Sequence, residues 1–184
     1  MDDATLQDKG KGDVVGFAEV DQTPDVRFFV EFLDAANALP DVQTLKTVMV
    51  DELRLSPGAW VLEVGCGTGD DARLLAALVG PDGRVVGIDA SEAMVGVARE
   101  RSTDSSLPVE FALGDVRALK FPDDAFDACR CERVLMHVDG DPASGVDEMV
   151  RAVNIVGLLV ERFDLTGDRS ALQLHRRGEL HPTG

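Results

Sequence analysis

The sequence predicts an α/β protein with a Rossmann-like, mostly parallel, doubly wound sheet. Short apolar segments alternate with amphipathic segments through the middle of the chain. This pattern produces parallel strands joined by right-handed crossovers, with helices on both faces of the sheet. The first apolar segment runs directly into a glycine-dense turn at residues 65–69, and Asp89 closes the second. Both features are typical of nucleotide-binding sheets.

The individual elements follow from the spacing of apolar residues. Apolar residues recur at helical spacing over 26–39 and 45–55, so two helices are expected before the first strand. Apolar runs bounded by Gly, Pro and Asp indicate strands at 60–64, 85–89, 109–113 and 126–131. Helices over 73–79 and from about Ser91 onward connect the first three of these strands.

One folded domain, residues 21–163, is expected between two terminal segments. The chain has 184 residues, of which 45% are hydrophobic, and this is enough for one substantial core. Residues 1–20 mix charge with glycine and predict a mobile arm. Residues 164–184 are polar and predict an irregular tail, with one candidate short strand at 171–174.

The charge balance argues against nucleic acid and membrane partners. Lys and Arg total 18 against 34 Asp and Glu, which gives a formal net charge of -16. Such a charge repels phosphate backbones and anionic membrane surfaces. The acidic start does not resemble a signal peptide, and no apolar run has the length of a membrane span. Together with only three cysteines, these features predict a cytoplasmic protein.

Three features converge on the carboxyl edge of the expected sheet, where folds of this type bind ligands. Gly65, Gly67 and Gly69 leave the backbone bare for a ligand and permit positive φ values. Asp89 stands where a carboxylate accepts hydrogen bonds from ribose hydroxyls, and Asp115 follows the third strand. Taken singly, these residues also fit an ordinary tight turn, a helix-capping aspartate and a turn residue. Together they predict a nucleoside ligand.

Five segments in order resemble the class I S-adenosylmethionine-dependent methyltransferases, in the small-molecule branch that includes the ubiquinone and menaquinone type. They read VLEVGCGTG, VVGIDASEAM, GDV, FPDDAFDAC and VLMHV, and the resemblance covers residues 55–153. It implies an enzyme that moves the methyl group of S-adenosylmethionine to a small, apolar acceptor. The cofactor-contacting residues that it implies are Glu63, Gly65, Cys66, Gly67, Thr68, Gly69, Asp89, Ala90, Asp115, Val116 and Arg130.

The resemblance also implies a role for the main groups in this set. Glu63 and the turn at 65–69 would hold the methionine part of the cofactor, and Asp89 would hold the ribose diol. Asp115 would contact the adenine amino group, and the main chain at Arg130 would contact the methionine amine.

Asp70 disfavours the alternative of a nicotinamide-dependent oxidoreductase. The dinucleotide fingerprint requires glycine at this position, and here an acidic pair, Asp70 and Asp71, opens the following helix. Acidic side chains suit the positive end of a helix dipole but repel a pyrophosphate. A sulfonium cofactor carries no phosphate, so the conflict does not arise.

His137 is the candidate catalytic residue, because it follows the fourth strand at the ligand edge and could act as a general base. The alternative, which we favour, is a structural histidine in the pocket wall. Phe28, Phe29 and Phe32 could likewise line an acceptor pocket, although their helical spacing favours a role in the core.

The cysteines do not predict a metal site. Cys129 and Cys131 lie two residues apart on a strand and share one face, but the chain has no companion set of ligands. We interpret them as small buried thiols, and Cys66 as a spacer in the glycine turn.

The carboxy-terminal part departs from the family pattern. The family has a helix, a Pro-Gly-Gly turn, a fifth strand, and then a helix with an antiparallel hairpin, whereas Asn154 leads directly into IVGLLVERF. Residues 155–161 fit a fifth strand or a helix, and we favour the strand. The final antiparallel hairpin is expected to be missing, which predicts an open sheet edge or apolar face that is covered by a homo-oligomer, covered by the first helices, or left uncovered. A cofactor-binding module without turnover, or a truncated enzyme, is therefore the alternative function.

Overall fold

A single six-stranded sheet organises the protein. The computed structural model describes residues 16–163 and 169–174. In spatial order the strands are β3 (Val109–Leu113), β2 (Arg84–Asp89), β1 (Trp60–Val64), β4 (Phe126–Glu132), β5 (Val153–Phe163) and β6 (Arg169–Leu174). The first five are parallel and β6 pairs antiparallel with β5. The predicted α/β class with a mostly parallel sheet is therefore confirmed.

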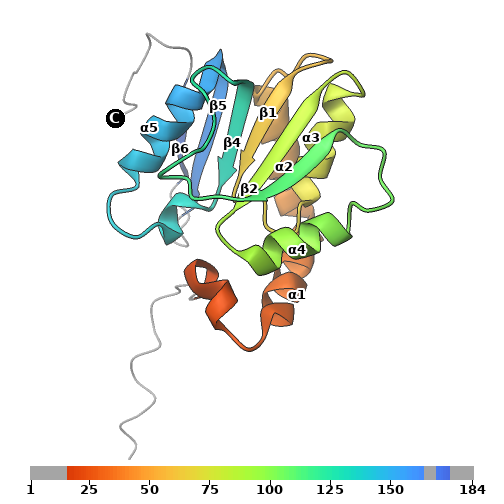
Figure 1. Cartoon of the computed structure of the whole chain (residues 1–184), viewed down its shortest axis with the longest axis vertical. Coiled ribbons are helices and arrows are strands. Elements are labelled where there is room, and N and C mark those ends of the chain that lie inside the picture. Colours follow the sequence, from red (N-terminus) through yellow and green to blue (C-terminus); the bar gives the residue numbers. More distant parts are fainter. Residues whose placement is uncertain (1–15, 164–168, 175–184) are drawn as a thin grey trace, which may run out of the picture.

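Helices cover both faces of this sheet (Figure 1). The helices are α1 (Val26–Asn37), α2 (Pro40–Glu52), α3 (Asp70–Val79), α4 (Glu92–Glu100) and α5 (Ala143–Ala152), with short 3-10 turns η1 (Phe17–Gln22) and η2 (Leu135–His137). One core cluster joins α2, α3 and α4 to the sheet, and the other joins α5 to the opposite face. None of the described helices is long and apolar enough to cross a membrane.

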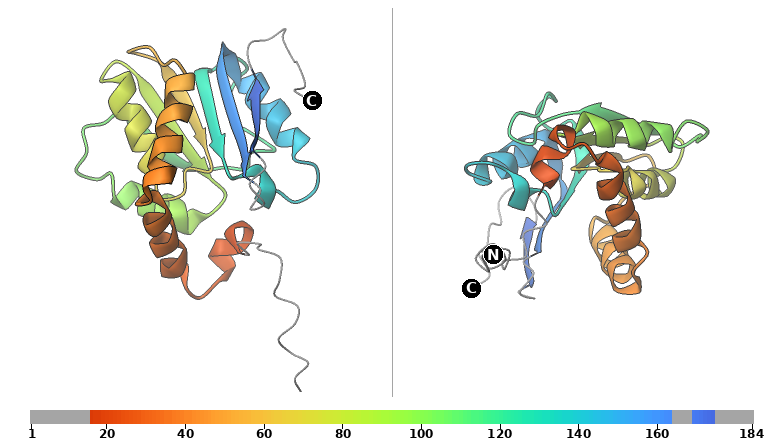
Figure 2. Two further views of the ribbon diagram at one scale, coloured as in Figure 1. Left: turned by 180° about the vertical axis from the view of Figure 1, so that it is seen from behind. Right: turned by 90° about the horizontal axis from the view of Figure 1, so that it is seen from below.

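The reversal of strand order falls between β1 and β4. Both neighbours of β1 are parallel to it, but β2 follows it directly in the chain, whereas β4 is reached only after β3. At such a switch point the connections leave in opposite directions and open a crevice at the carboxyl ends of the strands. Figure 2 shows η1 and α1 beside that end of the sheet, so they are placed to close the crevice.

The predicted arm is wrong at its last residues. Phe17–Gln22 forms η1, and Val20 is buried in a small cluster with Phe29 and Met94. Phe17 and Val20 help to attach this segment because they meet other apolar side chains on α1 and α4. Residues 1–15 lie outside the described part of the chain.

The predictions for the carboxy-terminal part need one correction. The fifth strand is confirmed as β5, but the tail is not irregular throughout, since the candidate strand at 171–174 forms and begins earlier, as β6 at residues 169–174. Among the described residues, β5 and β6 make one antiparallel pair directly, without the helix that precedes the final hairpin in the family pattern. Residues 164–168 and 175–184 lie outside the description, and the homo-oligomer stays a prediction.

Gly87 in the middle of β2 shows how closely the sheet and its helices pack. A Cβ atom there would lie 2.8 Å from the Phe111 ring and 2.9 Å from the Cys66 Cβ atom. Gly96, in the middle of α4, is exposed instead, and a Cβ atom at that position would meet no neighbouring atom within 4 Å.

We therefore predict opposite effects for two glycine-to-alanine changes. Gly87→Ala overpacks the core and should lower the free energy of unfolding by about 1–3 kcal/mol. Gly96→Ala, the matched control, should raise it by roughly 0.5–1 kcal/mol because alanine loses less backbone entropy in a helix. Urea unfolding of both variants measures the difference, and equal effects at the two sites would contradict this account of the packing.

Candidate cofactor and acceptor site

A cavity of about 400 Å³ lies at the carboxyl edge of β1, β2 and β4. All of the predicted site residues except Gly69 line it. Its outer wall comes from η1 and α1, which contribute Phe17, Val20, Phe32 and Leu33. The sheet edge and the amino-terminal elements thus enclose one space, as the position of the switch point predicts.

The glycine turn needs glycine for the conformation and packing of the protein itself. Gly65, Gly67 and Gly69 have φ values of 70°, 49° and 80°, in the left-handed region that side chains disfavour. A Cβ atom at Gly65 would lie 2.1 Å from Val134, and one at Gly69 would lie 2.8 Å from Phe111. We expected a side chain in this turn to collide with the ligand, but at Gly65 and Gly69 it would collide with other side chains of the protein. Gly69 does not line the cavity.

Asp89 holds the glycine turn against the start of α4. One carboxylate oxygen accepts a hydrogen bond from the Gly67 amide at 2.8 Å, and the other accepts from the Ser91 amide at 2.9 Å. Burial raises the pKa of Asp89 above its ordinary value. Each carboxylate oxygen has a second lone pair, so this side chain can still accept hydrogen bonds from a ligand. The alternative interpretation, an aspartate at a helix cap, is correct in part, because Asp89 accepts a hydrogen bond from the amide of Ser91, the N-cap residue of α4.

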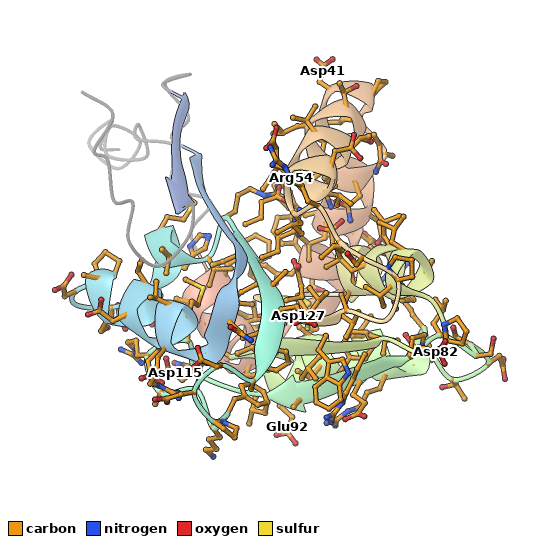
Figure 3. The ribbon with its side chains drawn as sticks, turned by 90° about the horizontal axis from the view of Figure 1, so that it is seen from above. Asp41, Arg54, Asp82, Glu92, Asp115 and Asp127 are labelled. Atoms are coloured by element: carbon orange, nitrogen blue, oxygen red, sulfur yellow. The ribbon has the colours of Figure 1, made fainter. Side chains whose placement is uncertain are left out.

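Asp115 lies at the rim of the cavity and is paired with Arg117. Both carboxylate oxygens of Asp115 contact the guanidinium, at 2.6–3.1 Å, and this contact lowers the pKa of Asp115. Figure 3 shows Asp115 on the side of the molecule that carries α5. Its neighbour Val116 is buried and packs in the core on that side.

A buried ion network forms the floor of the cavity. The guanidinium of Arg130 is fully buried and contacts Glu63 on β1 at 2.5 Å, Asp71 on α3 at 3.1 Å and Glu132 on β4. Lys46 on α2 donates to Asp71 at 2.7 and 2.8 Å and to Asn37 on α1 at 2.7 Å. The network thus joins side chains from β1, α1, α2 and α3 to those of β4.

Glu63 retains one unpartnered oxygen in this network. Its Oε1 atom contacts Arg130, whereas the buried Oε2 atom has no hydrogen-bond partner in the described structure. Burial raises the pKa of Glu63 to about 8, against the opposing charge of Arg130. An unpaired buried acceptor is costly, so a cationic donor in the cavity would bind here favourably.

The sequence-based prediction assigned only the main chain of Arg130 and missed Lys46, Asp71 and Glu132. A signal for Lys46 exists, because it falls at helical spacing with Met49 and Val50, which face the core. Arg130 and Glu132 lie two apart on a strand and therefore share a face. Nothing in the sequence indicates that all of these charges meet, since they come from separate elements.

Asp70 is held beside the glycine turn by contacts within the protein. It accepts hydrogen bonds from the Thr68 hydroxyl at 2.7 Å and from Asn37 at 3.2 Å, and it pairs with Arg73. The acid therefore stays beside the amino terminus of α3, where the helix dipole favours it. This supports the sequence-based argument against a dinucleotide.

Two amino-terminal elements, η1 and α1, form a cover over the cavity, and this cover is attached to both ends of α4. Asp21 on η1 accepts hydrogen bonds from the Ser91 hydroxyl at 2.5 Å and from two amides in the first turn of α4, at 2.8 and 3.1 Å. At the other end, both carboxylate oxygens of Asp34 on α1 pair with Arg101, at 2.7 and 2.8 Å. These contacts hold the outer wall of the cavity over the sheet edge.

Apolar and aromatic side chains line the part of the cavity under this cover. The Phe17 ring lies 5.8 Å from that of Phe32 and 5.7 Å from that of His137, between ring centroids. His137 therefore lines the cavity, as predicted. Of the three aromatic residues left open, Phe29 is core and Phe32 lines the cavity, whereas Phe28 is exposed and is not part of the wall.

The three cysteines are free and buried. Cys129 and Cys131 pack in the core on the α5 side, and burial raises the pKa of both thiols. Cys66 lines the cavity, and its pKa is also raised by burial, so its thiol is a poor nucleophile. Within the described ranges no cluster of His, Cys, Asp or Glu could hold a metal ion.

The comparisons with known proteins identify the family of the chain. The profile of the methyltransferase-domain family matches residues 61–157, more than half of the chain. An uncharacterised 37.1 kDa protein of transposon TN4556 from Streptomyces fradiae is 39% identical over 158 residues, which are 84% of this chain and 45% of that protein. A 2-phytyl-1,4-naphtoquinone methyltransferase of Synechococcus elongatus is 44% identical over 88 residues, 47% of this chain and 38% of the relative.

A solved S-adenosylmethionine-dependent methyltransferase from Aquifex aeolicus has the same fold. Its TM-score is 0.60 at 21% identity, over 79% of this chain and 72% of that one. The chain belongs to the methyltransferase-domain family, in which it is similar to the class I S-adenosylmethionine-dependent members. S-adenosylmethionine is therefore the cofactor of its family. The chain spans less than half the length of the two curated relatives.

We predict that Asp21 contributes to stability through α4. Asp21→Ala removes acceptors from the first turn of this helix and should lower the free energy of unfolding by about 0.5–2 kcal/mol, as loss of a helix cap does. Asp104→Ala, on an exposed turn, is the control and should change it by less than about 0.5 kcal/mol. Chemical denaturation tests both, and a loss confined to Asp104→Ala would refute the assignment.

Proposed function

We propose that the protein transfers the methyl group of S-adenosylmethionine to a small, apolar acceptor. The observation that carries the proposal is the pairing of the bare glycine turn with two carboxylates in one cavity, the half-buried Asp89 on β2 and the buried Glu63 on β1. Such a cavity suits a ligand with a diol at one end and a cation at the other. S-adenosylmethionine has both groups and no phosphate.

In this proposal the cofactor lies across the carboxyl ends of β1, β2 and β4. The ribose hydroxyls donate to Asp89, and the adenine lies beside Ala90, Asp115 and Val116. The methionine ammonium donates to the unpartnered oxygen of Glu63. The turn at 65–69, with Cys66 and Thr68, supplies the backbone wall between these two ends.

The acceptor lies under the cover in this proposal. Phe17, Phe32 and Met136 make that part of the cavity apolar, and an apolar ring or chain is what such a wall binds best. The named function of the Synechococcus relative, methylation of a naphthoquinone, supports an acceptor of this type.

Catalysis then rests mainly on alignment. The sulfonium is already an activated methyl donor, so the protein has to hold the acceptor atom about 3–3.5 Å from the methyl carbon and in line with the breaking C–S bond. If the acceptor must lose a proton, His137 is the candidate base, because it lines the cavity on the apolar side. The structural alternative for His137 predicts that its replacement changes KM more than kcat.

A second candidate is a cofactor-binding module without turnover. Both candidate functions predict that the cofactor binds, but only the methyltransferase predicts a methylated product.

Two experiments test the proposed function. S-adenosylhomocysteine should raise the melting temperature, whereas NADH and ATP at equal concentration should not. Incubation with cofactor carrying a labelled methyl group and a panel of naphthoquinols should then yield labelled product. Binding without product would favour the module, and stabilisation by NADH alone would refute both candidates.

We predict that Asp89 is required to bind the nucleoside part of the cofactor. Asp89→Asn removes the negative charge and leaves only one acceptor oxygen, so affinity for S-adenosylhomocysteine should fall about ten- to a hundredfold. Asp82→Asn, on the loop after α3 and across the molecule from Asp115 (Figure 3), is the control and should leave it unchanged. Calorimetry measures both affinities, and an unchanged Asp89→Asn variant would rule out the placement of the ribose.

We also predict that binding of the ammonium releases a proton from Glu63. In the free protein its pKa is about 8, so the carboxyl is mostly protonated at neutral pH. The ammonium favours the carboxylate and lowers this pKa, so affinity should rise as pH increases toward 8, by at most about tenfold per pH unit. Calorimetry in buffers of different ionisation enthalpy measures the released proton.

Glu63→Gln cannot titrate and should abolish both the proton release and the rise in affinity. 5′-Methylthioadenosine, which lacks the ammonium, should show neither effect with the unchanged protein. A pH-independent affinity for S-adenosylhomocysteine would contradict the role of Glu63.

A further inference from the structure

Four lysine and arginine side chains line the cavity, and in three of them the protein itself engages every terminal nitrogen. Lys46 directs its ammonium at Asn37 and Asp71. The terminal guanidinium nitrogens of Arg130 are taken by carboxylates, and the group has no exposed surface. Neither of these cations can turn toward a ligand without leaving a buried carboxylate unpaired.

Arg117 and Arg133 are the other two cations. All three guanidinium nitrogens of Arg117 make hydrogen bonds, to Asp115 and to the Asp139 carbonyl. Arg133 instead pairs through its Nε atom with the Glu132 carboxylate, at 3.0 Å. Among the described residues, Arg133 is therefore the cavity cation that keeps both terminal nitrogens available to a ligand. Its side chain is 32% exposed, so a ligand can reach it.

We propose that Arg133 binds the carboxylate of the cofactor's methionine part, opposite the ammonium site at Glu63. This inference rests on the proposed function, because it assigns the second charge of the same ligand. A guanidinium held at one edge still offers two parallel donors, and this geometry matches a carboxylate.

The position of Arg133 is set by the buried network. Glu132, which holds its Nε atom, has a side chain only 5% exposed and also contacts Arg130, and Arg130 contacts Glu63 at 2.5 Å. The ammonium and carboxylate sites are therefore joined through two side chains that cannot move independently. A ligand with both charges on one carbon atom needs sites held in such a fixed relation.

The backbone at Arg133 is unusual in a way that fits this role. Its φ value is 58°, in the left-handed region that a residue other than glycine occupies at an energetic cost. Arg133 lies between the end of β4 and η2, where the chain turns toward the cover. Glycine would fit this conformation without strain, so an arginine at this position lowers the local stability of the backbone.

The charges around the methionine end also balance only when Arg133 is included. Once the ammonium has displaced the proton of Glu63, three carboxylates, Glu63, Asp71 and Glu132, meet three cations, Lys46, Arg130 and Arg133. A ligand that brings one positive and one negative charge leaves this balance unchanged. A ligand that brings only a cation does not.

Two ligands and three variants test the inference. S-adenosylhomocysteine carries the carboxylate, and 5′-methylthioadenosine lacks the whole amino acid part. Arg133→Gln should lower affinity for S-adenosylhomocysteine roughly ten- to a hundredfold and change that for 5′-methylthioadenosine less than about twofold. Arg133→Lys keeps the charge and should recover part of the loss. Arg84→Gln, a surface arginine at the other end of the sheet, is the matched control and should change neither affinity.

Arg133→Gly separates binding from folding. It relieves the left-handed strain, so the melting temperature should stay the same or rise while affinity for S-adenosylhomocysteine falls as in Arg133→Gln. Unchanged affinity in both variants, as expected if Arg133 instead meets the carboxylate of an acceptor, would overturn the inference. An equal loss for both ligands would overturn it too, since it indicates a structural role.

If the unchanged protein binds 5′-methylthioadenosine but not S-adenosylhomocysteine, the assignment of Arg133 fails while the nucleoside site stands. If it binds neither ligand, the proposed function fails as well.

Discussion

The buried guanidinium of Arg130 is the constraint on which the rest of the site depends. It sits under the cavity with no exposed surface and is neutralised by carboxylates from three elements. A buried ion pair gives little net stability, because the loss of hydration offsets the attraction between the charges. Its effect is on geometry, since any shift of β1, β4 or α3 would leave a charge unpaired at a cost of several kcal/mol. The network thus fixes the strand ends that form the floor of the site.

The same constraint extends to the cover. Asp71 connects Arg130 to Lys46, and Lys46 reaches Asn37 at the end of α1. Asp21 and Asp34 attach the cover to α4, whose first residues also receive Asp89 through the Ser91 amide. The outer wall and the floor therefore share partners, so a ligand that contacts Asp89 or Glu63 affects contacts that hold the cover in place.

Most of the fold could be predicted from local patterns, and the site only in part. Strands bounded by glycine and aspartate carry their own signal, and Asp89 could be placed because its spacing from the glycine turn is set by one strand-helix unit. Lys46 and Asp71 could not, because their burial depends on a partner from another element. The segment at Phe17 was missed for the same reason, and strand β6 could be named only as a candidate at 171–174, since a short segment gains order only from what it packs or pairs with.

The electrostatics of the cavity explain why a fold shared with dinucleotide enzymes suits a sulfonium here. A pyrophosphate needs the positive end of α3, but Asp70 occupies that end and is held there by Thr68 and Arg73. The cavity wall that remains carries the acidic side chains of Glu63 and Asp89. These side chains can accept hydrogen bonds from an ammonium and from hydroxyl groups, which S-adenosylmethionine supplies and a pyrophosphate does not. The choice of cofactor thus follows from where the acids stand, on a backbone that by itself would accept either ligand.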